Sequence, residues 1–179
     1  EVNPAHMPAS PAGAIIANPN CSTIILLVAI TPLHRAFGVD RICVSTYQAA
    51  SGAGAQGMEE LENQTREVLA GRPAQPKVFD EPYAFNLFSH NSAMDVETGL
   101  NVEESKMIHE THKMWGSDAT RITATCIRVP VLRAHCESVN LTLARPATLR
   151  QVREILCKAA GLTLMDDRAA NSFPTPLKV

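Results

Sequence analysis

The sequence predicts an α+β domain: a mixed, largely antiparallel sheet with helices packed on one face. Helical and strand-like periodicities intermix along the chain, and no βαβ unit is repeated. The 179 residues are enough to enclose one hydrophobic core. A composition of 45% hydrophobic and 19% charged residues is typical of a globular protein rather than a disordered one. We expect residues 1–179 to form a single domain.

The first helix is predicted over residues 22–37. A turn at Asn18-Pro19-Asn20 precedes it, an apolar run covers residues 24–30, and Gly38 can cap its end. Cys21 therefore stands where a loop opens into a buried helix.

A strand is predicted from Val39 to Gln48, because apolar and polar residues alternate there. One face would hold four residues, Ile42, Val44, Thr46 and Gln48. The glycine-rich segment 49–57 follows, and a helix is predicted over residues 58–70. The segment lacks the Gly-Lys-Ser/Thr ending of a phosphate loop, so it is interpreted as a tight connection from strand to helix.

The remaining elements are predicted from hydrophobic periodicity and from Gly and Pro residues, which mark turns and the ends of elements. In chain order they are a short strand near 84–88, a helix over 102–115, strands over 121–129 and 134–143, and a helix over 148–160 that Gly161 ends. We expect the two longer strands to pair through a turn at Pro130.

Charge and cysteine content exclude several classes of function. A net charge of -2 without a basic stripe argues against nucleic-acid binding. The apolar runs are far shorter than the roughly 20 residues that span a bilayer. Five cysteines without paired spacing or a C-x-x-C motif indicate reduced thiols in a cytoplasmic protein. The chain opens on Glu1 without a signal peptide, which suggests a piece of a longer protein.

No metal site is expected. His109 and His112 are three residues apart, whereas the zinc-protease pattern needs histidines four apart on one helical face. We interpret both as histidines on a helix surface.

Cys21 is the first candidate for chemistry. Free backbone amides and the helix dipole at a helix N-terminus favour a thiolate, and the thiolate is the nucleophilic form. The alternative is that Cys21 is a small buried hydrophobe, as most free cysteines are.

A nucleophilic cysteine needs a base and a group that holds the substrate. If the two strands pair through Pro130, His135 and Arg128 lie near each other. A histidine can exchange the thiol proton, and an arginine fork binds a carboxylate with two hydrogen bonds. The alternatives are a hydrogen-bonded core histidine and an arginine paired with Glu137 or another carboxylate.

Glu103 and Lys106 are surface neighbours near the start of the helix over 102–115. The simplest interpretation is a solvated intrahelical ion pair. At a binding site, the same carboxylate and ammonium would instead bind an ammonium and an anion of the substrate.

Four separated segments resemble the bacterial type of aspartate-semialdehyde dehydrogenase, and the similarity runs nearly end to end in the same order. The segments are Asn18-Pro19-Asn20-Cys21-Ser22-Thr23, Ser45 to Gly54 (STYQAASGAG), Glu103-Glu104-Ser105-Lys106-Met107 and Cys126 to His135 (CIRVPVLRAH).

The resemblance implies the catalytic and dimerisation domain of that family, with its α+β fold. The family reversibly converts L-aspartate 4-semialdehyde, phosphate and NADP to L-4-aspartyl phosphate and NADPH. It serves lysine, threonine and methionine biosynthesis. The implied partners are L-aspartate 4-semialdehyde, phosphate and a second copy of the chain, in a homodimer or a dimer of dimers.

The resemblance also implies a role for each matching residue. The implied catalytic residues are Cys21 as nucleophile, His135 as acid and base, and Gln48 as the amide that orients the reacting group. The implied substrate contacts are Arg128 to the carboxylate, Glu103 to the ammonium, and Lys106 and Asn20 to or near the phosphate. Ser51 and Gly52 match a loop close to the nicotinamide.

The chain departs from the family in lacking its N-terminal nucleotide-binding domain and the C-terminal segment that returns to it. NADP would be bound mainly by that missing domain, and we expect the isolated chain to be inactive. Two alternatives stay open: an enzyme related to N-acetyl-glutamyl-phosphate reductase or glyceraldehyde-phosphate dehydrogenase, and a non-catalytic dimerisation module.

Overall fold

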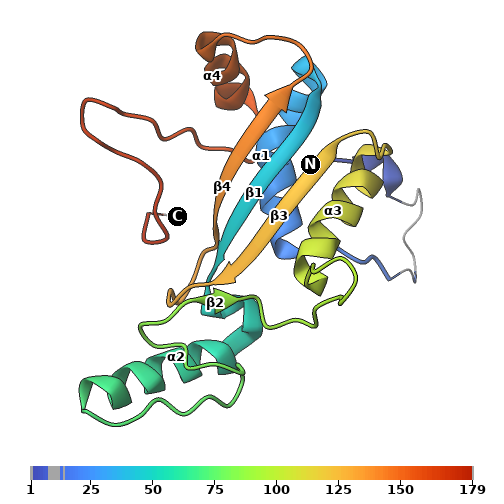
Figure 1. The fold of residues 1–179 in the computed structure, drawn as a ribbon. Coiled ribbons are helices and arrows are strands. Elements are labelled where there is room, and N and C mark those ends of the chain that lie inside the picture. The colour runs from blue at the N-terminus through green and yellow to red at the C-terminus, as the bar shows by residue number, and fades with distance from the viewer. Residues whose placement is uncertain (1, 8–12, 14, 179) are drawn as a thin grey trace. The chain divides into compact units, whose positions relative to one another are not determined.

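The computed structural model describes residues 2–7, 13 and 15–178 and confirms the α+β class (Figure 1). Within these residues, helices and strands follow one another in the order α1 (Cys21–Phe37), β1 (Val39–Gln48), α2 (Gly54–Leu69), β2 (Phe88–Ser89), α3 (Val102–Trp115), β3 (Arg121–Arg128), β4 (Cys136–Leu143) and α4 (Leu149–Lys158). Short 3-10 helices cover Pro4–His6 and Ala50–Ala53. β1 and α3 have the predicted bounds, and α1 begins one residue earlier than predicted.

The sheet has the strand order β2-β3-β1-β4, so the hairpin predicted between β3 and β4 is wrong. The linking segment 129–135 does not make a tight turn at Pro130. It runs past the end of β1, where the amides of Ala50 and Ser51 donate to the carbonyls of Val131 and Leu132 at 2.8 and 2.9 Å. These backbone bonds compete with a direct turn, and they leave β1 between the two strands.

The chain folds into two compact units. Unit 1 comprises Glu1–Cys43, Lys106–Thr123 and Val139–Phe173, and unit 2 comprises Val44–Ser105, Ala124–Ser138 and Pro174–Val179. Six of the nine predicted site residues belong to unit 2: Gln48, Ser51, Gly52, Glu103, Arg128 and His135. Asn20, Cys21 and Lys106 belong to unit 1.

In unit 1, α1 buries an apolar stripe that includes Leu26, Leu27 and Ile30, which explains why this segment is helical and apolar. Trp115, the last residue of α3, stacks on the imidazole of His34 with ring centroids 3.8 Å apart. Its indole N–H also donates to Thr31 Oγ1 at 3.0 Å. These contacts fix the end of α3 against α1.

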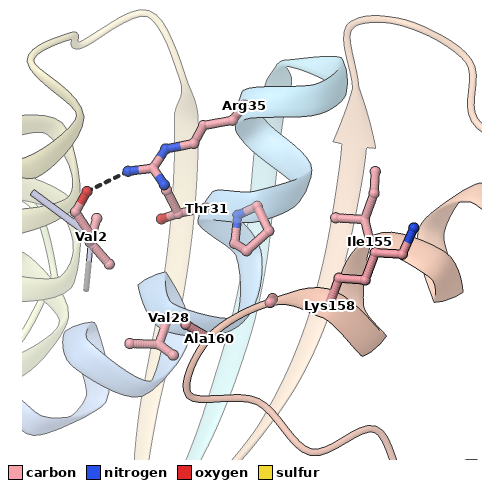
Figure 2. Close-up of a pocket in the computed structure, with 9 residues that line it drawn as sticks. Val2, Val28, Thr31, Arg35, Ile155, Lys158 and Ala160 are labelled. Atoms are coloured by element: carbon pink, nitrogen blue, oxygen red, sulfur yellow. Dashed lines mark hydrogen bonds between the residues drawn. The ribbon is translucent and has the colours of Figure 1, made fainter.

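A cavity of about 380 Å³ also lies within unit 1 (Figure 2). Residues of α1, of α4 and of the segment around Val2 line it. Arg35 reaches from α1 to the carbonyl of Val2, with an N···O distance of 2.6 Å. None of the predicted site residues lines this cavity.

In unit 2, α2 begins at Gly54, four residues before the predicted start. The glycine-rich segment 49–57 is therefore largely 3-10 and α-helical rather than a loop. On α2 the buried carboxylate of Glu60 accepts the amides of Lys77 at 3.0 Å and Phe79 at 3.4 Å, and that of Val78. The segment after α2 is thereby held along the helix (Figure 1).

The short strand predicted near 84–88 lies instead at Phe88–Ser89. Gln64 Oε1 accepts the amides of Tyr83 and Ala84 at 2.6 and 3.2 Å, so the backbone amides of these residues bond to α2 rather than to a neighbouring strand. Phe85 has a φ of 58°, which is incompatible with a strand. β2 then pairs antiparallel with β3, with Phe88 opposite Arg128.

The last helix, α4, ends at Lys158, before the predicted end, and Ala159 rather than Gly161 occupies its C-cap. Thr148 caps its start in a capping box with Gln151. Among the described residues, no helix is both long and apolar enough to cross a membrane.

Candidate functional site

Unit 2 brings five predicted site residues together at the ends of strands. Gln48 closes β1, Arg128 closes β3, and His135 directly precedes β4. Gly52 lies in the 3-10 turn after β1, and Glu103 lies in the first turn of α3. The backbone bonds between segments 48–51 and 129–132 hold these ends side by side.

Arg128 is 5% exposed, and the neighbours of its guanidinium include Asn91, Ala49 and Phe79. Nε donates to Asn91 Oδ1 at 3.4 Å, and a terminal nitrogen lies 3.5 Å from the carbonyl oxygen of Ala49. The guanidinium carbon lies 5.4 Å from the centroid of the Phe79 ring, within the range of a cation–π contact.

Gly52 marks the place where Arg128 and His135 converge. A Cβ atom at this glycine would lie 3.1 Å from a terminal nitrogen of Arg128 and 3.1 Å from both Cε1 and Nε2 of His135. The prediction that Arg128 and His135 lie near each other is therefore confirmed, although the predicted hairpin is not the cause.

His135 is half-buried, and its ring orientation is fixed by the backbone. The Ala49 amide donates to His135 Nδ1 at 3.0 Å, which leaves the Cε1–Nε2 edge on the side of Gly52. Ala134 has a φ of 67°, a conformation that non-glycine residues rarely adopt, directly before this histidine. The pKa of His135 lies below its usual value of 6.5, because burial disfavours the imidazolium and the Arg128 charge adds repulsion.

We expect His135 to titrate below pH 6.5 and hence to be neutral at pH 7, since a lowered pKa extends the range of the neutral ring to lower pH. The Arg128→Met variant removes the second cause, so its His135 pKa should be higher. Imidazole NMR titration of the chain, with the His135→Asn spectrum as assignment, measures both values. A His135 pKa at or above 6.5, or one that does not rise in Arg128→Met, would contradict this electrostatic account.

Glu103 is 5% exposed, so its carboxylate is buried and not solvated as the simplest interpretation assumed. Gln48 Nε2 lies 3.4 Å from Glu103 Oε1, and His90 Nε2 lies 3.9 Å from the same oxygen. The Glu103 amide donates to Ser92 Oγ at 3.2 Å. Unit 2 therefore holds two buried charged groups, the carboxylate of Glu103 and the guanidinium of Arg128, and polar side chains lie next to each of them.

In unit 1, Cys21 is the first residue of α1 and is exposed, so the alternative of a buried hydrophobe is wrong. Asn20 is the N-cap: its side-chain oxygen accepts the amides of Ser22 and Thr23 at 2.9 and 3.3 Å. The Asn20 amide donates to Glu110 Oε2 at 2.8 Å. A thiol at a capped helix N-terminus is in the predicted setting for a nucleophile.

Cys126 differs from Cys21 in that its thiol is buried. It is 0% exposed, and burial raises its pKa to about 12. Such a thiol is protonated at neutral pH and is inert as a nucleophile.

Lys106 is exposed on α3, and Ser51 is half-buried in the turn that also holds Gly52. Gly52 is exposed, so a flat group could approach this backbone closely, as the predicted contact with a nicotinamide requires. Among the described residues, no group of His, Cys, Asp and Glu side chains could hold a metal ion. His109 is exposed as predicted, whereas His112 is half-buried, with its Nε2 2.8 Å from the carbonyl oxygen of Thr120.

Sequence reasoning did not single out Phe79, Asn91 or Glu104, which support the predicted residues. The first two come from the segment 72–101, which has no periodicity to indicate where its side chains lie. A signal for Glu104 was present, because Asn101 and Glu104 have the spacing of a capping box.

Comparison with known proteins gives consistent matches. The semialdehyde dehydrogenase dimerisation domain matches residues 30–179. The aspartate-semialdehyde dehydrogenase of Synechocystis is 49% identical over 163 residues, which cover 91% of this chain and 48% of that protein. The chain thus spans about half the length of the curated relatives it matches.

Solved structures agree. Aspartate semialdehyde dehydrogenase II from Vibrio cholerae, complexed with ASA, is 39% identical with a TM-score of 0.87, over 92% of this chain and 48% of that one. The Candida albicans aspartate semialdehyde dehydrogenase with NADP is 26% identical with a TM-score of 0.54, over 82% of this chain and 37% of that one. On the match over residues 30–179, this chain belongs to the family of semialdehyde dehydrogenase dimerisation domains.

Proposed function

We propose that the protein containing this chain is an NADP-dependent aspartate-semialdehyde dehydrogenase, for which the chain supplies the catalytic residues. The observation that carries the proposal is the pair of buried opposite charges in unit 2. Arg128 and Glu103 are each 5% exposed, and each is held by polar neighbours. The Synechocystis and Vibrio cholerae relatives support the same activity.

The two charges suit an α-amino acid. The guanidinium of Arg128 would bind the α-carboxylate, and the carboxylate of Glu103 would bind the α-ammonium. Burial makes both interactions strong, because little water competes for the charges. A substrate that lacks either charged group would lose one of these two interactions, which disfavours its binding.

In the proposed reaction the thiolate of Cys21 adds to the aldehyde carbon and forms a thiohemiacetal. NADP, when bound, supplies the acceptor for the hydride that leaves this carbon. His135 donates a proton to the thiohemiacetal oxygen and removes it again as the hydride leaves. The product is a thioester of Cys21. An oxygen of phosphate then attacks the thioester carbon, and the thiolate of Cys21 leaves as L-4-aspartyl phosphate forms.

The other predicted residues have supporting roles in this proposal. Gln48, whose amide lies 3.4 Å from Glu103, would orient the reacting group. Lys106 and Asn20 would bind or lie near phosphate, and Ser51 and Gly52 would border the nicotinamide. We further propose a homodimer, which the matched dimerisation domain supports, and a cytoplasmic location, which the five free cysteines favour.

A substrate comparison tests the proposal. The complete enzyme, with the nucleotide-binding half that we propose joined to this chain, should turn over L-aspartate 4-semialdehyde with NADP and phosphate. Preference for N-acetyl-glutamate semialdehyde would overturn the assignment in favour of the related reductase. Absence of any turnover of either aldehyde would favour the non-catalytic dimerisation module.

A further inference from the structure

Glu104 follows Glu103 on the first turn of α3, and it is also buried, at 8% exposure. Its carboxylate accepts two backbone amides, one at each oxygen. Oε2 accepts from Asn101 and Oε1 accepts from Cys126, both at 3.0 Å. The proposed reaction makes no use of this carboxylate, although it lies one residue from the proposed ammonium-binding group.

The contact with Asn101 fixes where α3 begins. Asn101 Oδ1 accepts the Glu104 amide at 2.9 Å while Glu104 Oε2 accepts the Asn101 amide, which is the reciprocal pattern of a capping box. Since the helix start sets the direction of every side chain on the first turn, this pair sets the direction of Glu103.

The contact with Cys126 replaces a bond of the sheet. The β2–β3 register, continued by two residues from Phe88 and Arg128, places His90 opposite Cys126. The His90 amide donates to the Cys126 carbonyl at 2.8 Å, as in an antiparallel ladder. The Cys126 amide, however, donates to Glu104, so the carboxylate joins α3 to β3 only two residues before Arg128.

We propose that Glu104 is a positioning residue that sets the separation between Glu103 and Arg128, and thereby selects an α-amino acid over its des-amino analogue. The inference rests on the proposed function. One carboxylate is bonded both to the helix turn that carries Glu103 and to the strand that carries Arg128. A side chain that can accept a hydrogen bond from only one of the two amides would no longer join the helix turn to the strand.

The Glu104→Gln variant of the complete enzyme tests this role, because glutamine has one acceptor oxygen where glutamate has two. KM for L-aspartate 4-semialdehyde should rise about tenfold, as for the loss of one hydrogen bond to a charged group. The inhibition constant of succinic semialdehyde, which carries the carboxylate and aldehyde but no ammonium, should change by less than about twofold, since it does not use Glu103.

A double-mutant cycle separates positioning from stability. In the Glu103→Gln background, Glu104→Gln should raise KM no further, because the group it positions is gone. Glu154→Gln, on an exposed glutamate of α4, is the matched control and should leave KM unchanged. Glu104→Asp retains the charge and serves if Glu104→Gln does not fold, with the same direction expected because its shorter side chain cannot span both amides.

Equal rises for the two aldehydes, or an unchanged KM in a wild-type enzyme that is active, would overturn the role of Glu104 and leave the proposed function intact. A wild-type enzyme that does not turn over L-aspartate 4-semialdehyde would overturn the proposed function and this inference with it.

Discussion

Replacement of Cys21 by Ala should lower kcat of the complete enzyme by at least about 10⁴-fold, because it removes the nucleophile that forms the proposed thioester. Cys21 is exposed at the start of α1, directly after Asn20, whose side chain accepts the amides of Ser22 and Thr23. The measurement is NADPH formation from L-aspartate 4-semialdehyde, with circular dichroism to verify folding.

The Cys157→Ala variant is the matched control, since Cys157 is also exposed but lies on α4. It should retain the activity of the wild type. A Cys21→Ala enzyme with more than about a hundredth of wild-type activity would show that another nucleophile is used.

Replacement of Gly52 by Ala should lower kcat/KM by about tenfold, less than the roughly hundredfold effect of a 1 Å displacement at a reacting group, because the neighbours need to move by only a few tenths of an ångström. The new methyl group would lie 3.1 Å from the tips of both Arg128 and His135, so at least one of them must move. Because Gly52 is exposed, the free energy of unfolding should change little. Steady-state kinetics and urea denaturation measure the two quantities.

Gly57→Ala provides the contrasting variant on the same stretch of chain. Its methyl group would lie 2.8 Å from the Ala53 side chain and 2.9 Å from the Ala50 carbonyl, within the buried packing of α2. Here the free energy of unfolding should fall. Loss of stability without loss of kcat/KM in Gly52→Ala would contradict the convergence of Arg128 and His135 at this glycine.

The elements predicted most accurately are those with strong local patterns. β1 follows from strict alternation of apolar and polar residues, and α1 follows from an apolar run between a turn and Gly38. The order of the strands could not be predicted this way. It depends on backbone bonds between segments 48–51 and 129–132, which are far apart in the sequence.

The site residues also divide into those that local sequence patterns indicate and those whose setting depends on contacts distant in the sequence. The motifs indicated Cys21, Arg128 and His135 by residue type and family resemblance. They did not indicate that Glu103 is buried, because an acidic residue near a helix start is exposed in most proteins. Its carboxylate lies near His90 of the irregular segment 72–101, which has no periodic pattern to reveal where its side chains lie.

Covalent trapping tests the central proposal most directly. The complete enzyme is mixed with L-aspartate 4-semialdehyde and NADP without phosphate, quenched in acid, digested and examined by mass spectrometry. The account predicts an aspartyl thioester on the peptide that contains Cys21, formed together with NADPH and discharged when phosphate is added. NADPH formation with Cys21 unmodified, or a thioester on any of the other four cysteines, would contradict it.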